Sequence, residues 1–308
     1  MVSTRRGSVF EFSVDSDLPF KFLRTGEGTH SLRVDEAPNS ALQQEGQPLF
    51  EWKIRDNTGD ITAQLYHSAG TYHFWTADAG WYRIDPVNRV ITIPNEGDEV
   101  RRESRLWGVP TMLCFVELGD VPLHASAVEI PGGAVLFAAP GRFGKTTLAL
   151  AFHARGYRVL SEDLSCCRLT PELALLPGPA SLRIRPDMFE GQVPQGTELV
   201  SIRPDRVVLA LDSNRSGNSK PVPIRSIVFL RESSDDQIRL EPVESVRSLP
   251  DLWALSFRPK GDSALAHSFR RLSSLATGAA VWNLYRPLRV DMLNDVIDRI
   301  VSVCGRPT

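Results

Sequence analysis

The sequence lacks several features that would assign a protein to a class at once. No apolar run is long enough to span a bilayer, and the first residues, MVSTRRGSVFEF, contain no apolar segment typical of a signal peptide. Lys and Arg number 35 against 37 Asp and Glu, and no basic block stands out, so a nucleic-acid partner has no electrostatic support. We therefore expect a soluble, cytoplasmic protein that binds neither membrane nor nucleic acid.

Cysteine is also scarce. Cys114, Cys166, Cys167 and Cys304 fit neither the spacing of a zinc site nor a disulfide framework. We expect reduced, mostly buried thiols. The apolar, charged, Gly and Pro fractions lie near the globular average, and 308 residues are enough for two domains with sizeable cores.

Residues 1 to 110 are expected to form a β-rich domain that recognises a substrate. Short alternating runs recur there: VFEFSV, PFKFLR, LFEWKIRD, ITAQLYH, TYHFWTA, WYRID and RVITI. Turn residues such as DNTG and AG separate them, and this pattern favours an antiparallel sheet. A helix between Pro110 and Gly119 is expected to lead into a second domain, residues 111 to 308.

From Val121 onward the pattern predicts an α/β fold. AVLFA reads as a strand, Lys145 to Arg155 as a helix closed by Gly156, and YRVLS as the next strand. The strands VVLALD, IRSIVFLR and AVWNLYR and helices over residues 244–257, 262–276 and 289–304 follow. The polar segment SNRSGNSK, residues 213–220, is either a flexible surface loop or a flap over a substrate.

The segment AAPGRFGKTT predicts a phosphate-binding loop between a strand and a helix. Gly141 and Gly144 give the loop its freedom, Lys145 is the phosphate lysine, and Thr146 carries the hydroxyl for Mg²⁺. Ala139 replaces the usual first glycine and fits if its φ is negative. The residues expected to bind a nucleotide are Ala139, Pro140, Gly141, Arg142, Phe143, Gly144, Lys145, Thr146 and Thr147.

Two acids, Glu162 and Asp163, end the next strand. Ligands of open α/β sheets collect at the carboxyl ends of parallel strands. One acid there can hold Mg²⁺, directly or through water, and the other can take a proton from an attacking hydroxyl. His124 precedes the loop strand, and taken alone it is better explained as a hydrogen-bonded strand histidine than as a catalytic one.

Together, H-A-S-A-V, A-x-x-G-x-F-G-K-T-T and G-Y-R-V-L-S-E-D resemble the HPr kinase/phosphorylase family. They look most like the HPr-kinase-like enzymes of ribosomal-peptide clusters, including lasso-peptide precursor kinases. The motif order matches, as do the intervals from His124 to Thr146 and from Thr146 to Asp163. The match covers mainly residues 120 to 170, and further on only the order of elements is similar.

This resemblance implies an HPr-kinase-like P-loop kinase core that uses ATP and Mg²⁺. Its expected activity is phosphorylation of a serine hydroxyl in a peptide or protein, such as a lasso-type precursor peptide. Family members are often oligomeric, so a homo-oligomer stays open here.

The resemblance also implies roles for individual residues. Asp163 maps to the family's proton acceptor, His124 to the histidine that assists it, and Lys145 to the family lysine. Glu162 maps to the first acid of the family's D-D pair and can share the metal with Thr146. The family's later E-I-R-G stretch carries a magnesium-binding glutamate, and arginine stands at that place here, so the second metal contact and the phosphorylase reaction are not carried over.

Arg183 and Arg185 lie in that later stretch, LRIRP. They are either contacts for a phosphate or substrate carboxylate or exposed strand arginines. Three functions stay open: a peptide or protein serine kinase, a small-molecule hydroxyl kinase, and a non-catalytic nucleotide-binding regulator. The two acids and His124 favour catalysis over regulation, and the large N-terminal domain favours a peptide acceptor.

Overall fold

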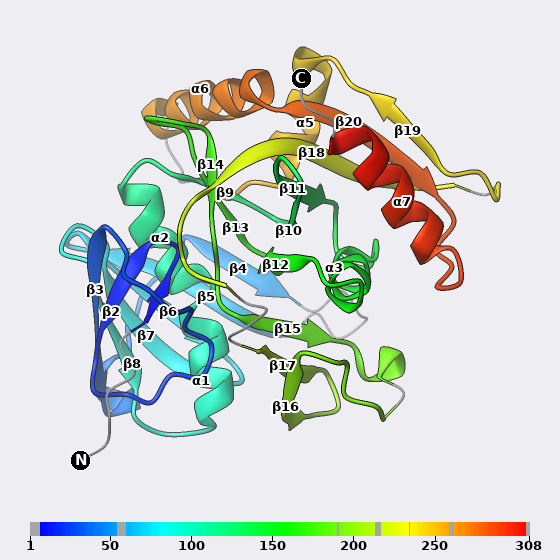
Figure 1. Ribbon diagram of the computed structural model, residues 1–308. Coiled ribbons are helices and arrows are strands. Elements are labelled where there is room, and N and C mark those ends of the chain that lie inside the picture. The colour runs from blue at the N-terminus through cyan, green and yellow to red at the C-terminus, as the bar shows by residue number, and fades with distance from the viewer. Residues whose placement is uncertain are drawn as a thin grey trace. The chain divides into compact units, whose positions relative to one another are not determined.

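The computed structural model describes residues 7–53, 60–189, 191–212, 217–233, 235–258 and 262–305, with the backbone alone for 262 and 263. The chain divides into two compact units, Met1–Gly119 and Asp120–Thr308 (Figure 1). The division follows Gly119 and not residue 110, because helix α2 (Val109–Glu117) packs against strand β7 (Gly80–Asp85) of the first unit. Residues 213–216 and the predicted DNTG turn lie outside the described residues, so the choice between loop and flap stays a prediction.

The first unit is built on one mixed sheet. Its other strands are β1 (Ser8–Val9), β2 (Phe12–Asp15), β3 (His30–Ala37), β4 (Phe50–Lys53), β5 (Ile61–Ser68), β6 (Thr71–Thr76) and β8 (Val90–Pro94). Among the described residues these form an eight-stranded sheet in the order β1-β2-β3-β8-β7-β6-β5-β4. The pairs from β4 to β8 are antiparallel, as predicted, but β3 runs parallel to both β2 and β8. The long connections before and after β3 allow this, since they return the chain to the same end of the sheet.

Local backbone explains where the predicted strands of this unit differ from the structure. VFEFSV forms the two strands β1 and β2, because Phe10 and Glu11 have φ of 48° and 63° and reverse the chain between them. PFKFLR forms no regular strand. Strand β3 was not predicted, although its buried Leu32 and Val34 alternate with polar neighbours.

Two helices follow this sheet where one was predicted. Helix α1 (Glu99–Leu106) begins after Asp98, whose side chain accepts a hydrogen bond from the Arg101 N–H. Helix α2 has Pro110 in its first turn, as predicted, and ends before Gly119, whose φ is 98°. A single 3-10 turn, Asn39–Ala41, lies between β3 and β4.

A second, larger sheet forms the framework of the second unit. Its strands are β9 (Val121–Leu123), β10 (Ala125–Ile130), β11 (Gly133–Ala138), β12 (Arg158–Ser161), β13 (Ser165–Arg168), β14 (Ala174–Leu176), β18 (Val222–Glu232), β19 (Arg239–Pro242) and β20 (Ala280–Arg286). In the described part of the chain these nine strands follow the path β12-β10-β11-β18-β14-β13-β9, with β20 beside β18 and β19 beside β20. Strand β18 is parallel to β11 and β20, whereas β10 is antiparallel to both of its neighbours, β11 and β12. The carboxyl ends of β11, β12, β18 and β20 therefore lie at the same edge as the amino end of β10.

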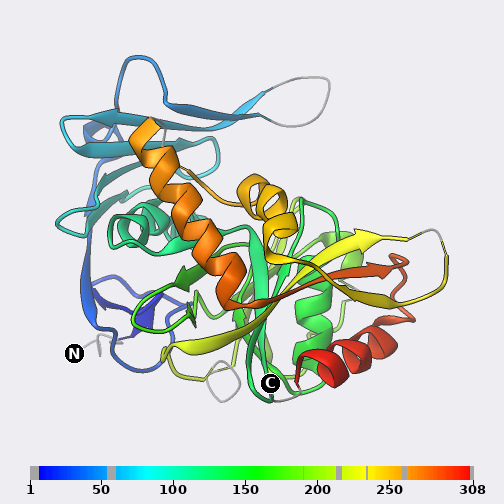
Figure 2. The same ribbon diagram turned by 90° about the horizontal axis from the view of Figure 1, so that it is seen from above.

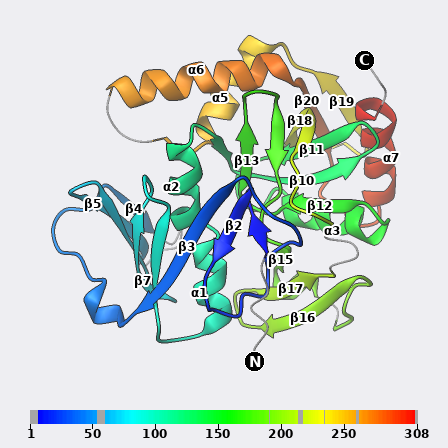
Figure 3. The ribbon, with the colours of Figure 1, turned by 60° about the vertical axis from the view of Figure 1, so that its left-hand side comes forward.

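Helices and a small sheet cover this framework. They are α3 (Lys145–Ala154), α5 (Ser245–Ala254), α6 (Asp262–Gly278), α7 (Leu293–Cys304), the 3-10 turn Pro186–Met188, and strands β15 (Ser181–Ile184), β16 (Thr197–Ile202) and β17 (Val207–Leu211). Figure 1 shows α5 and α6 on one side of the sheet and α3 on the other, and Figure 2 shows α7 beside α3. The small sheet, in the order β15-β17-β16, lies on the α3 side (Figure 3).

The alternation of side chains along β11 divides the core of this unit in two. Val135 and Phe137 pack with α3, α7 and the small sheet, whereas Ala134 and Leu136 pack with α5 and α6. Both faces are buried, and this explains why β11 reads as a continuous apolar run.

Helix α3 ends as predicted. Arg155 is its C-cap, and Gly156 follows with φ of 87° and donates its N–H to the His153 carbonyl. Only glycine adopts this left-handed position at low cost.

All four cysteines are buried free thiols, as predicted. Burial raises the pKa of the Cys114 thiol to about 12, so this group stays protonated. Within the described ranges, no helix has both the length and the apolar character required to cross a membrane.

Candidate functional site

The loop from β11 to α3 has the backbone of an anion-binding turn. Arg142 and Gly144 have φ of 72° and 79°, so the left-handed positions are these two residues and not Gly141. Mixed left- and right-handed backbone directs successive N–H groups to one side, and the first turn of a helix leaves further N–H groups without backbone partners. Ala139 avoids the left-handed region and is buried, so its Cβ is accommodated.

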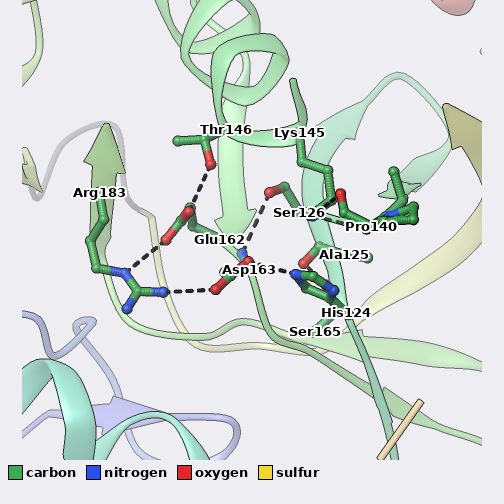
Figure 4. A network of polar contacts seen from close by, with 11 residues as sticks. His124, Ala125, Ser126, Pro140, Lys145, Thr146, Glu162, Asp163, Ser165 and Arg183 are labelled. Atoms are coloured by element: carbon green, nitrogen blue, oxygen red, sulfur yellow. Dashed lines mark hydrogen bonds and ion pairs between the residues drawn. The ribbon is translucent and has the colours of Figure 1, made fainter. Parts of the chain in front are cut away.

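Lys145, the first residue of α3, folds back over this loop. Its Nζ donates hydrogen bonds to the carbonyl oxygens of Ala139 and Pro140 at 2.9 and 3.1 Å (Figure 4). Burial lowers the pKa of the ammonium, and the nearby carboxylates of Asp163 and Glu162 oppose that shift. The lysine thus places a positive charge at the loop, and its hydrogen bonds connect the end of the loop to its beginning.

Thr146 and Glu162 place two side-chain oxygen atoms next to each other where α3 begins and β12 ends. Thr146 Oγ1 donates to Glu162 Oε1 at 2.8 Å. Burial raises the pKa of Glu162, and the charge of Arg183 and the Thr146 hydroxyl oppose this. Among the described residues, no group of three or more His, Cys, Asp or Glu side chains is placed to hold a metal. The pair fits Mg²⁺ that is shared with substrate phosphates, since Mg²⁺ commonly takes only one or two protein ligands there.

Asp163 lies in a strained turn at the same edge. Its φ is 65°, and the Leu164 N–H donates to the Glu162 carbonyl across it at 2.8 Å. A positive φ is uncommon for a residue other than glycine, although Asp tolerates it better than most, and such strain gathers at functional sites. The Asp163 N–H donates to Ser126 Oγ at 3.5 Å.

His124 is the partner of the Asp163 carboxylate. Its Nε2 lies 2.8 Å from Asp163 Oδ1, and both side chains are partly exposed. The backbone N–H of His124 donates a hydrogen bond at 2.7 Å to the carbonyl of Leu255, the residue that follows α5. This contact fixes the backbone at His124. The strand histidine considered from the sequence is therefore part of the site.

The topology explains why these distant residues meet. Strand β10 runs antiparallel between β11 and β12, with Ala125 opposite Ala138 and Ala127 opposite Ser161. The residue before β10 and the residues after β11 and β12 consequently share one edge.

Arg183 joins the two acids from β15 of the small sheet. Its Nε donates to Glu162 Oε2 at 3.1 Å and its Nη2 to Asp163 Oδ2 at 3.2 Å (Figure 4). Its side chain is only 28% exposed, so it is not an exposed strand arginine. Arg185 follows β15 and is exposed: its side chain is 50% exposed and pairs with Asp187 at 3.2 Å.

The charges around Asp163 keep it ionised. Burial alone would raise the pKa of its carboxyl group, but the hydrogen bond with His124 and the charge of Arg183 outweigh burial and hold that pKa well below its ordinary value. In turn, the charge of Glu162 and then that of Asp163 raise the pKa of Arg183. The carboxylate is therefore available at neutral pH to accept a hydrogen bond from a hydroxyl group.

Two buried serines support the site and were not singled out from the sequence. Ser126 accepts from Asp163, while Ser165 Oγ donates to the Ala125 carbonyl at 3.0 Å and lies 2.7 Å from Ser161 Oγ. Ser126 stands within the HASAV motif, but the pattern does not distinguish an inward-facing serine from an ordinary strand serine.

No family model matches this chain, and neither does any curated protein. Among solved structures, the chain is similar to a kinase. That structure is described as the Hpr(Ser) kinase/phosphatase from Coxiella burnetii, and the match covers 58% of this chain and 94% of that chain at 13% identity and a TM-score of 0.30. The similarity is distant.

Proposed function

We propose that this protein is a kinase that transfers the γ-phosphoryl group of ATP to a serine hydroxyl of a peptide or protein. The observation that carries the proposal is the Asp163 carboxylate, held between His124 and Arg183 beside the Thr146–Glu162 pair. A base, an oxygen pair suited to Mg²⁺ and the positive end of α3 share one edge of the sheet. Phosphoryl transfer requires this combination of groups.

Each residue has a distinct task in this proposal. The loop N–H groups and Lys145 bind the phosphates, and Thr146 with Glu162 would hold Mg²⁺, which supplies positive charge to the phosphate oxygens. Asp163 orients the acceptor hydroxyl and takes its proton as the oxygen bonds to the γ-phosphorus and ADP leaves. His124 fixes the orientation of Asp163 through their hydrogen bond.

The acceptor is proposed to be a peptide or protein serine, with a ribosomal precursor peptide of the lasso type as the leading candidate. The separate β-rich unit supports a large acceptor, because a small hydroxyl compound needs no second domain for recognition. We propose that this unit, residues 1–119, recognises the peptide.

Mass spectrometry tests the activity. The protein is incubated with ATP, Mg²⁺ and a panel of serine-containing peptides, each paired with its Ser→Ala version, and we expect added phosphate only where serine is present. Phosphate on small hydroxyl compounds but on no peptide would favour a small-molecule kinase. Slow ATP hydrolysis without any acceptor in a lysate screen would favour a regulator.

Asp163→Asn tests the proposed base. We expect ATP affinity to be retained and transfer to fall by about 10²- to 10⁴-fold, the usual contribution of a general base. Asp187→Asn is the matched control, because it removes an exposed carboxylate paired with Arg185 and should leave transfer unchanged. An Asp163→Asn protein with full transfer activity would exclude Asp163 as the base.

A further inference from the structure

Arg286, the last residue of β20, is a buried cation that has no role in the reaction proposed above. It is only 3% exposed, and burial lowers the pKa of its guanidinium group. None of the ion pairs between described residues includes it. Glu232, opposite it on β18, is exposed and forms no ion pair with it. Its Nε is also buried and donates no hydrogen bond to a described residue.

A buried charge without a counter-charge is costly, so its retention calls for a partner. The strand pattern shows where that partner lies. Trp282, Leu284 and Arg286 alternate along β20, and Trp282 and Leu284 pack in the same core as α3. Arg286 therefore faces the side of the sheet where α3 begins.

The guanidinium group of Arg286 contacts the loop at its junction with α3. Its Nη2 donates to the Phe143 carbonyl at 3.1 Å. A Cβ built on Gly144 would lie 2.7 Å from Nη2 and 3.8 Å from Cζ, so the group lies directly against this glycine. The position needs glycine for its φ of 79° and also for this close approach.

This contact fixes the direction of one N–H group. The carbonyl of Phe143 and the N–H of Gly144 belong to one trans peptide, in which the two bonds point in opposite directions. Because Arg286 holds the carbonyl, the Gly144 N–H points away from Arg286. Lys145 covers the same loop from the other end, through Ala139 and Pro140.

We propose that Arg286 is a positioning residue of the phosphate site, which sets the Gly144 N–H for an anion and whose buried charge is balanced when the phosphates of a nucleoside di- or triphosphate bind. This inference rests on the proposed nucleotide site and adds a residue to it. Its ligand chemistry is the diphosphate group, and neither the nucleoside nor the acceptor takes part.

Binding measurements test this role. Affinities of ADP, pyrophosphate and adenosine are measured by calorimetry for the unmodified protein, Arg286→Met and Arg239→Met. Arg239 is the matched control, since it is an arginine of the adjacent strand β19 that is 37% exposed and pairs with Asp235. We expect Arg286→Met to weaken ADP and pyrophosphate binding by about 10- to 100-fold, the range for a lost charged hydrogen bond, and to leave any adenosine binding unchanged.

Thermal unfolding without ligand separates this role from a structural one. Arg286→Met should melt no lower than Arg239→Met, because the change removes a buried charge that lacks a counter-charge, while the increase in Tm produced by pyrophosphate should be lost. A purely structural arginine would show the reverse: a lower Tm and an unchanged pyrophosphate effect in the folded fraction.

The outcomes distinguish this inference from the proposed function. If the unmodified protein binds neither ADP nor pyrophosphate, both are wrong. If it binds them and Arg286→Met binds them as Arg239→Met does, only the role of Arg286 is wrong. Should Arg286→Met fail to fold, Arg286→Gln decides the same comparison, because glutamine keeps a donor and removes the charge.

Discussion

At the scale of single residues, Arg183 is the cation that contacts both acids of the site. It donates to both Glu162 and Asp163 from strand β15 of the small sheet. The charge of Arg183 opposes the effect of burial on the pKa of both carboxyl groups. Mg²⁺ at Glu162 would compete with Arg183 for the same carboxylate oxygen atoms. We therefore expect Arg183 to raise the Mg²⁺ concentration that is needed for the metal to bind.

Replacing Arg183 by Met should lower the free energy of unfolding by an amount that depends on pH. Asp163 has a lowered pKa, so its stabilising contribution is present above its ordinary pKa and is lost as pH falls through the folded value. Glu162 has a raised pKa, so without Arg183 its ionisation destabilises the fold as pH rises through that value. The Asp163 contribution is still present at pH 4, so the Glu162 effect is the one that makes the deficit larger at pH 7 than at pH 4.

We expect a deficit of about 1–3 kcal/mol at pH 7, below the ~3–5 kcal/mol for breaking a wholly buried pair because Arg183 keeps some exposure. Denaturant unfolding at the two pH values measures it. Arg185→Met removes only an exposed pair and should cost about 0–1 kcal/mol at either pH. Equal deficits for Arg183→Met at both pH values would contradict this account of the charges.

At the scale of elements, the site depends on how α3 begins more than on how it ends. Both ends carry a glycine with positive φ, Gly144 at 79° and Gly156 at 87°. They differ in their surroundings: a Cβ on Gly156 would meet nothing within 4 Å, whereas one on Gly144 would meet Arg286.

Alanine at each position separates backbone strain from the loop contact. Gly156→Ala and Gly144→Ala should each cost about 1–2 kcal/mol of unfolding free energy, because both force alanine into the left-handed region. Only Gly144→Ala should also weaken ADP binding, since it displaces Arg286 from the Phe143 carbonyl. Denaturant unfolding and calorimetric titration provide the two measurements, and equal ADP affinities in the two variants would contradict the assigned contact.

At the scale of the whole molecule, all the residues of the proposed nucleotide site belong to one of the two units. They lie between His124 and Arg286, within Asp120–Thr308. A ligand at 100 times its Kd adds about 2.7 kcal/mol to the stability of the state that binds it. We expect this stabilisation to be measurable at the residues that contact the ligand.

Hydrogen exchange of the intact chain locates this effect. With ADP and Mg²⁺, amides of residues 139–148 and 160–164 should exchange more slowly, because the ligand suppresses local opening there. Strands β4 to β6 of the first unit contain no site residue and serve as the internal control. Protection of those strands equal to that of the loop would show that the nucleotide binds elsewhere.

Local features of the site could be predicted from the sequence because neighbouring residues determine them. The strand–loop–helix from Gly133 to Ala154, its closure at Gly156 and strand β12 follow from apolar runs and glycine placement. Strand β3 and helix α1 were missed although their signals, alternation at Leu32 and Val34 and a cap at Asp98, are present.

The amino-acid sequence is enough to predict a strand, a glycine-containing loop and a helix with Lys145 and Thr146 at its start, together with two acids after the next strand. The antiparallel direction of β10 between β11 and β12, which brings His124 to Asp163, is known from the folded structure alone. The same holds for Arg183 and Arg286, which reach this edge from β15 and β20. Backbone conformation and hydrophobic periodicity depend on residues that are near neighbours in the sequence. The contacts of His124, Arg183 and Arg286 instead join segments that are far apart in the chain. Packing sets the order and direction of those segments, and the sequence pattern does not show it.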